Sequence, residues 1–253
     1  MSWKHALVTG ASSGIGRGLA ERIAATGALV VLCARREREL GRVAEGIERA
    51  GGHAKVAALD VGDTERTVAA IRALDEEVGG LDLVVANAGV GAPPPASPLA
   101  WETLRHPCHV NFCGAVATLT AVLPQMVARG RGHIVGVSSL ASFGALPASG
   151  AYCAPKAGLS MLLECLRLDL LDTGVAATTI HAGFVRTAMV EHATFPMPML
   201  MSVEEAVDLV MLELPKRPAT IDFPRPLALA ARVAAGLPRS LRELAARRQR
   251  AVR

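Results

Sequence analysis

The chain has 253 residues, of which 51% are hydrophobic and 20% are charged. This balance excludes an intrinsically disordered protein, because such proteins combine low hydrophobicity with high net charge. The net charge of +4 comes from residues 225–253, which hold eight Arg and one Glu, or +7, so residues 1–224 carry 4 − 7 = −3. A slightly acidic body with 3% aromatic residues lacks the basic face and the stacking platform of nucleic-acid-binding proteins. We therefore expect no nucleic-acid partner.

Short apolar runs alternate with helical patterns through the first two thirds of the chain. Most runs are apolar throughout, as in strands that are covered on both faces of a parallel sheet. Repeated strand–helix units predict right-handed crossovers and an α/β fold with a doubly wound parallel sheet. The predicted strands are His5–Thr9, Ala28–Ala34, Ala54–Leu59, Asp82–Asn87, His133–Ser138 and Ala176–His181, and the predicted helices are Ile15–Thr26, Arg36–Ala50, Thr64–Val78, Trp101–Arg129 and Ala157–Asp172.

The C-terminal third departs from this alternation. Ser202–Leu214 is predicted to be a helix with Ser202 as its N-cap, and Ala219–Phe223 a last strand. Beyond it, leucines and a valine recur at helical spacing around Gly236 and Pro238, which predicts two short amphipathic helices. No linker or repeat divides the chain, so we expect one domain over residues 1–253, with residues 224–253 as its basic helical extension. The recurring apolar residues are Leu229, Val233, Leu237, Leu241 and Leu244.

The cysteines and the apolar segments bear on the compartment. No stretch reaches about 18 uninterrupted apolar residues, so no transmembrane helix is expected. The chain runs from Met1 into an apolar strand without a cleavage site, so no signal peptide is expected. An odd number of cysteines without CxxC spacing predicts reduced thiols, and hence a cytoplasmic protein. The five are Cys33, Cys108, Cys113, Cys153 and Cys165.

A glycine-rich segment, Thr9-Gly10-Ala11-Ser12-Ser13-Gly14-Ile15-Gly16, joins the first predicted strand to the first predicted helix. Glycines in such a turn allow a pyrophosphate to approach the backbone at the helix N-terminus. The spacing Gly-x3-Gly-x-Gly differs from the usual GxGxxG, and taken alone it is also compatible with a turn that binds nothing. Its strand–helix context favours a dinucleotide site.

Two arginines, Arg35 and Arg36, follow the second predicted strand, and no acidic residue lies between Val30 and Arg36. In a dinucleotide-binding fold an acidic residue here would bind the adenosine ribose, whereas an arginine accommodates a 2′-phosphate. The alternative is two solvated arginines at a helix start. The sequence favours NADP(H), with NAD(H) possible.

Tyr152 is the only tyrosine in the chain, and one of its four lysines, Lys156, follows at i+4. This spacing places both side chains on one helix face, where the ammonium would favour the phenolate and lower the tyrosine pKa. Ser139 lies 13 residues before Tyr152. A phenol tuned toward ambient pH is suited to general acid–base catalysis. A surface Tyr–Lys pair is the alternative interpretation.

Together these motifs resemble the short-chain dehydrogenase/reductase family over about residues 4 to 190. The resemblance implies a Rossmann-like α/β/α fold and an NAD(P)-dependent oxidoreductase acting on CH–OH groups. Tyr152 would be the acid–base, and Lys156 would hold the nicotinamide ribose and lower the tyrosine pKa. Ser139 would bind the substrate oxygen, and Asn111 would support a proton relay through Lys156. The expected cofactor-binding residues are Gly10, Ser12, Ser13, Gly14, Ile15, Gly16, Arg35, Arg36, Asp60, Val61, Asn87, Ala88, Gly89, Tyr152, Lys156, Gly183, Val185 and Thr187.

Three positions depart from the family pattern. Ala86 stands where an Asn usually precedes Asn-Ala-Gly, and Ala182-Gly183 stands where Pro-Gly usually follows the sixth strand. Pro155 lies between the tyrosine and the lysine, which predicts that the helix starts just before it, because proline is tolerated in a first helical turn. None of these changes removes a catalytic side chain.

Two other clusters have less specific interpretations. A group of His and Cys residues has a spacing that permits two metal ligands, but no second ligand pair is evident, so we expect no metal. An apolar segment around two prolines is compatible with a substrate lid or with core packing. The first group is His106, Cys108, His109 and Cys113, and the second is Phe195, Met197, Met199 and Met201.

The sequence thus predicts a hydride-transferring enzyme that acts on an apolar carbonyl or alcohol, and a homodimer or homotetramer. An NAD-dependent alcohol dehydrogenase and a non-catalytic nucleotide-binding scaffold are the alternatives. The basic extension would dock on the body, on a sister subunit, or on an anionic membrane as a peripheral contact.

Overall fold

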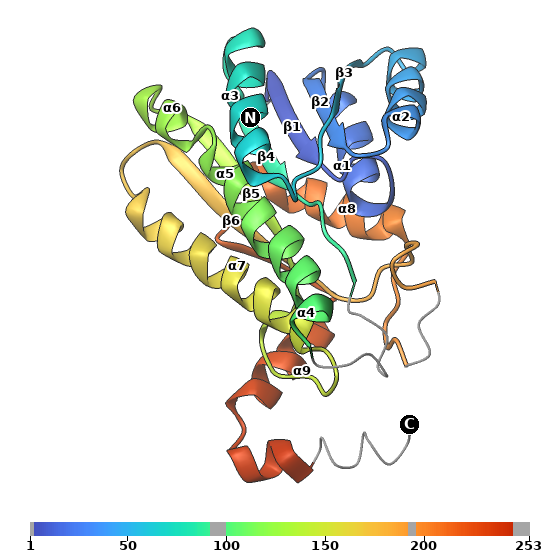
Figure 1. The fold of residues 1–253 in the computed structure, drawn as a ribbon, viewed down its shortest axis with the longest axis vertical. Helices are drawn as coiled ribbons and strands as arrows, with labels where there is room; N and C mark the ends of the chain where they lie inside the picture. The colour runs from blue at the N-terminus through green and yellow to red at the C-terminus, as the bar shows by residue number, and fades with distance from the viewer. Residues whose placement is uncertain (1–2, 92–99, 192–195, 245–253) are drawn as a thin grey trace.

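The computed structural model describes residues 3–91, 100–191 and 196–244. Within them, seven strands form one parallel sheet in the order β3-β2-β1-β4-β5-β6-β7 (Figure 1). The strand order reverses between β1 and β4, the position at which doubly wound sheets bind ligands. The strands are β1 His5–Thr9, β2 Leu29–Ala34, β3 His53–Ala58, β4 Leu83–Ala86, β5 Gly132–Ser139, β6 Val175–Ala182 and β7 Thr220–Phe223.

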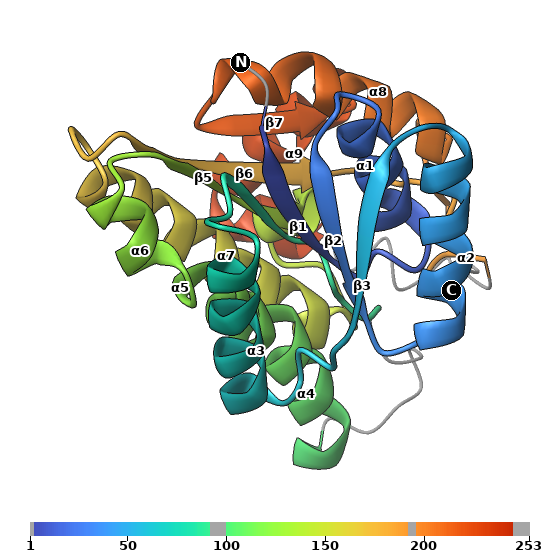
Figure 2. The same cartoon turned by 90° about the horizontal axis from the view of Figure 1, so that it is seen from above.

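Helices cover both faces of the sheet (Figure 2). One layer contains α1, α2 and α8, and the other contains α3 to α7. A last helix, α9, packs on β7 and on the short turn Leu140–Ser142. The helices are α1 Gly14–Ala24, α2 Glu37–Arg49, α3 Thr64–Glu77, α4 Trp101–Cys108, α5 Ala115–Thr120, α6 Leu123–Ala128, α7 Gly150–Asp169, α8 Val203–Glu213 and α9 Arg225–Gly236.

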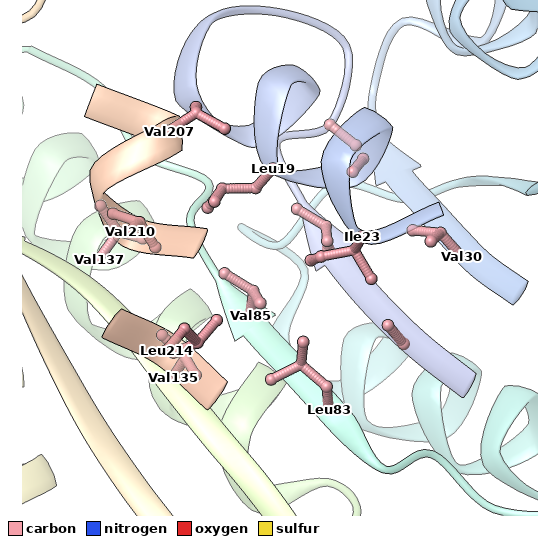
Figure 3. Close-up of a cluster of buried hydrophobic side chains, with 14 of the residues drawn as sticks. Leu19, Ile23, Val30, Leu83, Val85, Val135, Val137, Val207, Val210 and Leu214 are labelled. Carbon is pink, nitrogen blue, oxygen red and sulfur yellow. The ribbon is translucent and has the colours of Figure 1, made fainter. Parts of the chain in front are cut away.

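Alternate residues of each central strand pack into opposite layers. Ala6 and Val8 of β1 face the cluster formed with α1 and α8, whereas Leu7 between them faces α3, α5 and α7. Figure 3 shows Leu19 of α1 and Val207 of α8 above the strands in the first cluster. Burial on both faces explains why the strands are apolar throughout, and it confirms the predicted three-layer fold.

The predicted helix from Trp101 to Arg129 is wrong as a continuous helix. It consists of α4, a π-helical stretch His109–Gly114, α5 and α6. Pro124 is the second residue of the last piece, where its missing N–H suits a first helical turn. Short π-helical stretches often accompany functional sites, and this one contains Asn111.

The start of α7 also differs from the prediction. The helix begins at Gly150, before Tyr152, and not at Ala157 or just before Pro155. The carbonyl of Ser149 accepts hydrogen bonds from the N–H groups of Tyr152 and Cys153, at 3.0 and 2.8 Å, which closes the first turn ahead of the proline. Pro155 is therefore in the second turn, where its lack of an N–H removes one helical hydrogen bond.

The C-terminal elements agree with the pattern that predicted them. Ser202 caps α8 through a capping box with Glu205. α9 ends at Gly236, and helical structure resumes at residues 239–244. Phe195 of the apolar segment and residues 245–253 of the basic extension lie outside the described residues.

By length and composition, one described helical stretch, residues 101–128, is long and apolar enough to cross a membrane. Its most apolar window has a mean hydropathy of 1.5, and 56% of that window is buried inside the fold. Buried core helices satisfy the same criterion, so this stretch is weak evidence for a membrane span.

Candidate active site

The glycine-rich turn between β1 and α1 is closely packed against the end of β4. Gly10 has φ +68°, and a Cβ there would lie 2.7 Å from Nδ2 of Asn87. Gly14 has φ +55°, and a Cβ there would lie 3.1 Å from Cγ2 of Thr187. Both positions need glycine for conformation and for space. The two glycines therefore allow the tight turn that leads into the N-terminus of α1, the position at which helices bind phosphates.

Thr9 joins the turn to the segment after β4. Its Oγ1 accepts hydrogen bonds from the N–H groups of Asn87 and Ala88, both at 3.1 Å, and donates one to the Val85 carbonyl at 3.3 Å. Nδ2 of Asn87 in turn donates to the Thr9 carbonyl at 2.9 Å. These bonds fix the edge of the sheet where the strand order reverses. Thr9 belongs to the glycine-rich segment, but it was not predicted to be a site residue.

Of the two arginines after β2, the structure brings Arg36 to the glycine-rich turn. Its Nη2 donates hydrogen bonds to the hydroxyls of Ser12 and Ser13, each at 2.9 Å. Arg35 is exposed, and within the described residues it makes no hydrogen bond or ion pair. The β2 end therefore presents one positioned guanidinium beside the phosphate turn.

Ser139, Tyr152 and Lys156 meet at the carboxyl end of β5. Oγ of Ser139 donates to the Ala182 carbonyl at 3.2 Å and is hydrogen-bonded to the Tyr152 side chain. Nζ of Lys156 lies 5.9 Å from the centre of the Tyr152 ring and donates to the Val137 carbonyl at 2.7 Å. The lysine is 5% exposed, so its ammonium is nearly enclosed by protein.

Burial determines the protonation of this group. Desolvation raises the pKa of Tyr152 above 10, and the hydrogen bond with Ser139 opposes that rise. Desolvation lowers the pKa of Lys156 from 10.5 to about 8. The expected lowering of the tyrosine pKa by Lys156 is therefore not found. The ammonium is bonded to a backbone carbonyl instead, and burial disfavours the charge of both side chains.

The side chain of Asn111 is hydrogen-bonded to the loop that follows β4. Its Oδ1 accepts the N–H of Val90 at 2.8 Å, and its Nδ2 donates to the carbonyl of Val90 at 2.9 Å. A Cβ on Gly89 would lie 2.9 Å from Oδ1 of Asn111 and 3.5 Å from Nζ of Lys156. The predicted neighbourhood of Asn111 and Lys156 is thus present, with Gly89 packed against both.

The remaining predicted cofactor positions lie around the same end of the sheet. Thr187 lies over Gly14, and the Gly183 N–H donates to the Phe223 carbonyl at 2.7 Å. Val185 pairs with Met201 in an isolated bridge. Partly buried Ile15 packs on the core, and after β3 Asp60 Oδ1 accepts the Gly62 N–H at 2.9 Å, beside buried Val61.

A chain of polar side chains behind the site was not predicted. Ser138 and Ser160 share a hydrogen bond of 2.8 Å, and both donate to the carbonyl of Lys156. The ring of His181 bonds to Ser160 at 3.2 Å and to Asp222 at 2.7 Å. Arg232 Nη2 donates to Asp222 at 2.7 Å, linking α9 to this chain. The available signal was the position of two titratable residues, His181 and Asp222, in adjacent apolar strands.

The histidines and cysteines near α4 do not assemble into a metal site. Among the described residues, no group of three or more His, Cys, Asp or Glu side chains is placed to hold a metal ion. Nε2 of His109 is instead hydrogen-bonded to the carbonyl of Gly62 at 2.7 Å. In the apolar segment, Met201 is held in the bridge with Val185, and Met199 is 54% exposed.

Comparison with known proteins identifies relatives over nearly the whole chain. An "Uncharacterized oxidoreductase" from Myxococcus xanthus is 49% identical over 250 residues, which cover 99% of each chain. A "Fatty acyl-CoA reductase" from Acinetobacter baylyi is 34% identical over 221 residues, covering 86% of this chain and 75% of the relative.

Solved structures share the fold. A short-chain dehydrogenase from Sphingobium yanoikuyae in complex with NADPH matches with a TM-score of 0.80 and 27% identity, covering 87% of this chain and 88% of that one. A 3-oxoacyl-[acyl-carrier protein] reductase from Brucella melitensis with bound NAD matches with a TM-score of 0.74 and 28% identity, covering 87% and 89%.

The sequence model of the family described as "short chain dehydrogenase" matches residues 4–196. That span contains every motif on which the expected family rests, from the glycine-rich turn to Thr187. The chain belongs to the short-chain dehydrogenase/reductase family and is an NAD(P)-dependent oxidoreductase.

Proposed function

We propose that this enzyme transfers a hydride between NADP(H) and a carbonyl or secondary alcohol carbon, with Tyr152 as the general acid–base. One observation carries the proposal. Ser139, Tyr152 and Lys156 converge at the carboxyl end of β5, at the same edge of the sheet as the glycine-rich turn. A non-catalytic scaffold would not need a buried lysine beside a buried phenol, because both groups lose solvation there.

The residues present fit a nicotinamide dinucleotide. Gly10 and Gly14 have positive φ angles and no side chains, which allows the tight turn that leads into the N-terminus of α1. Ser13, the N-cap residue, makes no capping hydrogen bond, which leaves the first N–H groups of α1 available to a pyrophosphate. When bound, the nicotinamide supplies the hydride for the carbonyl carbon.

The chain's own residues then manage the substrate oxygen. Ser139 donates a hydrogen bond to it, and Tyr152 Oη donates the proton that completes the alcohol. The raised pKa keeps Tyr152 protonated at neutral pH, which suits the reducing direction. Lys156 would bind the ribose hydroxyls of the cofactor and would keep a positive charge near the phenol. Asn111 holds the loop carrying Gly89 and Val90 against this group and keeps the lysine in place.

Arg36 favours NADP(H) over NAD(H). Its guanidinium is already oriented on Ser12 and Ser13, beside the turn that would take the pyrophosphate. An arginine in this place accommodates a 2′-phosphate. The alternative is an NAD-dependent alcohol dehydrogenase, in which Arg36 would serve only to brace the turn.

The substrate is proposed to be an apolar carbonyl compound. The segment after β6 presents methionines, among them the exposed Met189 and Met199, and methionine adapts to irregular apolar ligands. The similarity to a fatty acyl-CoA reductase is compatible with this class. All five cysteines are free, which is compatible with the cytoplasm.

A homodimer or homotetramer is proposed because apolar side chains are exposed on α7 and at the start of α4. Met161, Leu168 and Leu171, at the outer side of α7 and just beyond it, are each more than half exposed, as is Trp101 at the start of α4. Contiguous exposed apolar side chains commonly mark contacts between chains. The native mass from sedimentation equilibrium, compared with that of Leu168→Glu, tests this assembly.

The experiment that tests the function is NADPH oxidation over a panel of carbonyls, from small ketones to long-chain aldehydes and acyl thioesters. Tyr152→Phe should lose at least 100-fold in kcat on the best substrate, because general acid catalysis is worth about 10²–10⁴-fold. NADPH binding by the variant should be unchanged, since the phosphate contacts lie elsewhere. A phenylalanine variant with near-normal turnover would refute the role of Tyr152, and the absence of turnover by the parent enzyme on every carbonyl would favour the scaffold.

A further inference from the structure

The C-terminal helix α9 turns its larger apolar side chains away from the body. Its inward face is Ala228, which is buried, with half-buried Leu227, Ala231 and Ala235. Leu229 and Val233, one position further round, are 65% and 60% exposed. The stripe continues through Leu237, Leu241 and Leu244, which are 38%, 49% and 50% exposed. We call these five residues, Leu229, Val233, Leu237, Leu241 and Leu244, the outward stripe.

Polar contacts fix this orientation. Arg232 donates to Asp222 of β7 at 2.7 Å, and its guanidinium lies 4.3 Å from the centre of the Phe143 ring. The side chain of Arg232 is 49% exposed, and these two contacts join α9 to β7 and to Phe143 in the observed orientation. Among the described residues, none covers the outward stripe, and Figure 1 shows α9 at one end of the molecule, where a flat surface can approach it.

Charge identifies the partner. Residues 225–253 carry +7, whereas the rest of the chain carries −3 by the same count. Arg225 is 82% exposed and lies 3.8 Å from Glu213, and the side chain of Arg242 has no hydrogen bond or ion pair within the described residues. Two copies joined through this stripe would bring two +7 segments together, whereas an anionic bilayer attracts them. The acidic body would be repelled by the same bilayer, which confines the contact to this end.

We propose that the outward stripe and its arginines form a peripheral binding surface for an anionic lipid bilayer. A helix with an apolar face and a basic polar face lies in the interface plane, with the apolar side chains between the headgroups and acyl chains. The contact is reversible and does not span the membrane. It would place the enzyme at the surface where apolar carbonyl compounds partition, although it does not depend on the identity of the substrate.

Co-sedimentation of the full-length protein with vesicles tests the surface. The protein should pellet with vesicles of equal parts phosphatidylglycerol and phosphatidylcholine, and not with phosphatidylcholine alone. Replacing Leu229 and Val233 together with Glu should weaken binding at least tenfold, because both lose apolar burial and add negative charge. Arg242→Gln should weaken it about fivefold. Leu212→Glu on α8, at a side chain that is 67% exposed, is the matched control and should bind as the parent does.

Thermal unfolding temperatures of the variants check that the fold is intact, and native mass is measured alongside. Equal pelleting of the double variant and the parent would overturn the proposal. So would a change in native mass without a change in lipid binding, because the stripe would then be a contact between copies. NADPH turnover does not enter the test, so this proposal and the proposed function fail independently.

Discussion

Lys156 illustrates how function and stability oppose each other in one residue. Its ammonium is enclosed, and burial lowers its pKa from 10.5 to about 8. At neutral pH the lysine is still charged in the folded and the unfolded chain, so the folded state bears the full desolvation cost. At about 1.36 kcal/mol per pH unit, that cost is about 3 kcal/mol. The hydrogen bond to the Val137 carbonyl opposes this cost and only partly offsets the loss of water.

Lys156→Met should therefore raise the free energy of unfolding at pH 7 while it abolishes turnover. Allowing about 1 kcal/mol for the lost hydrogen bond, the gain is about 1–2 kcal/mol. The folded-state pKa is the lower one, so between about pH 8 and 10.5 the unfolded chain holds the extra proton, and the parent gains stability as pH rises. The gap between the two proteins should close over that window in urea titrations. Leu162→Met, in the same helix, should keep the parental pH profile. A gap that does not change with pH would contradict the lowered pKa.

Arg36 and Arg35 form a natural matched pair for cofactor selectivity. Arg36→Gln should raise the Kd for NADPH about tenfold and leave the Kd for NADH within about twofold, because a charge-assisted bond at an exposed site is worth at least 1 kcal/mol. Arg35→Gln should change neither, since Arg35 is exposed and makes no bond within the described residues. Fluorescence titrations at one ionic strength measure the six dissociation constants, those of the parent and the two variants for each cofactor. Equal or tighter binding of NADH than NADPH by the parent enzyme would reject the preference.

At the scale of elements, the strands could be predicted and the irregular helices could not. A strand such as β5 is apolar throughout because both of its faces are covered, and that pattern is visible in the sequence. The π-helical stretch at Asn111 depends on tertiary contacts, among them Gly114 against the Val61 backbone, which no local pattern encodes. The predicted start of α7 was wrong because proline is typical of a first helical turn, and Pro155 was therefore placed there. In the structure, hydrogen bonds to the Ser149 carbonyl form the first turn before Pro155.

The same limit applied to the site. Tyr152, Lys156 and Ser139 could be identified because their spacing is characteristic of a known family. Choosing between Arg35 and Arg36 required the positions of Ser12 and Ser13, and recognising His181 with Asp222 required the register of β6 and β7, which pairs these two residues. Long-range register is not visible in a single sequence.

Asp222 connects β7 to α9, so its replacement should loosen that helix alone. Burial opposes the charge of Asp222, but hydrogen bonds from His181 and Arg232 outweigh it and keep its pKa below 3.8. Asp222→Asn removes the charge from both bonds, and amide hydrogen exchange in α9 should quicken about fivefold for about 1 kcal/mol lost. Asp208→Asn, which breaks an exposed ion pair between α8 and α1, is the control and should leave α9 unchanged. Faster exchange throughout the molecule would indicate a global loss of stability and would contradict a local role of Asp222 in holding α9.

At the scale of the whole molecule, one sheet joins the glycine-rich turn at β1 to the proposed catalytic residues at β5 and α7. The two core clusters lie on either side of that sheet, and both draw residues from the first and the second half of the chain. No described segment separates these halves into independent cores. We therefore propose that residues 3–244 unfold as one cooperative unit, with the outward stripe as a surface of that unit.

The two tryptophans report on this unit from different places. Trp3 is 6% exposed at the start of β1, and Trp101 is 70% exposed at the start of α4. Thermal unfolding followed by far-ultraviolet circular dichroism and by tryptophan fluorescence should give the same single transition. NADPH at 100 times its Kd should stabilise the folded state by about 2.7 kcal/mol, which corresponds to about 5–10 °C in Tm for a protein of this size. Both signals should move together, because the proposed cofactor site spans β1 to β5. Two transitions, of which NADPH moves only one, would show that the chain contains two independently folding parts and that the single-domain proposal is wrong.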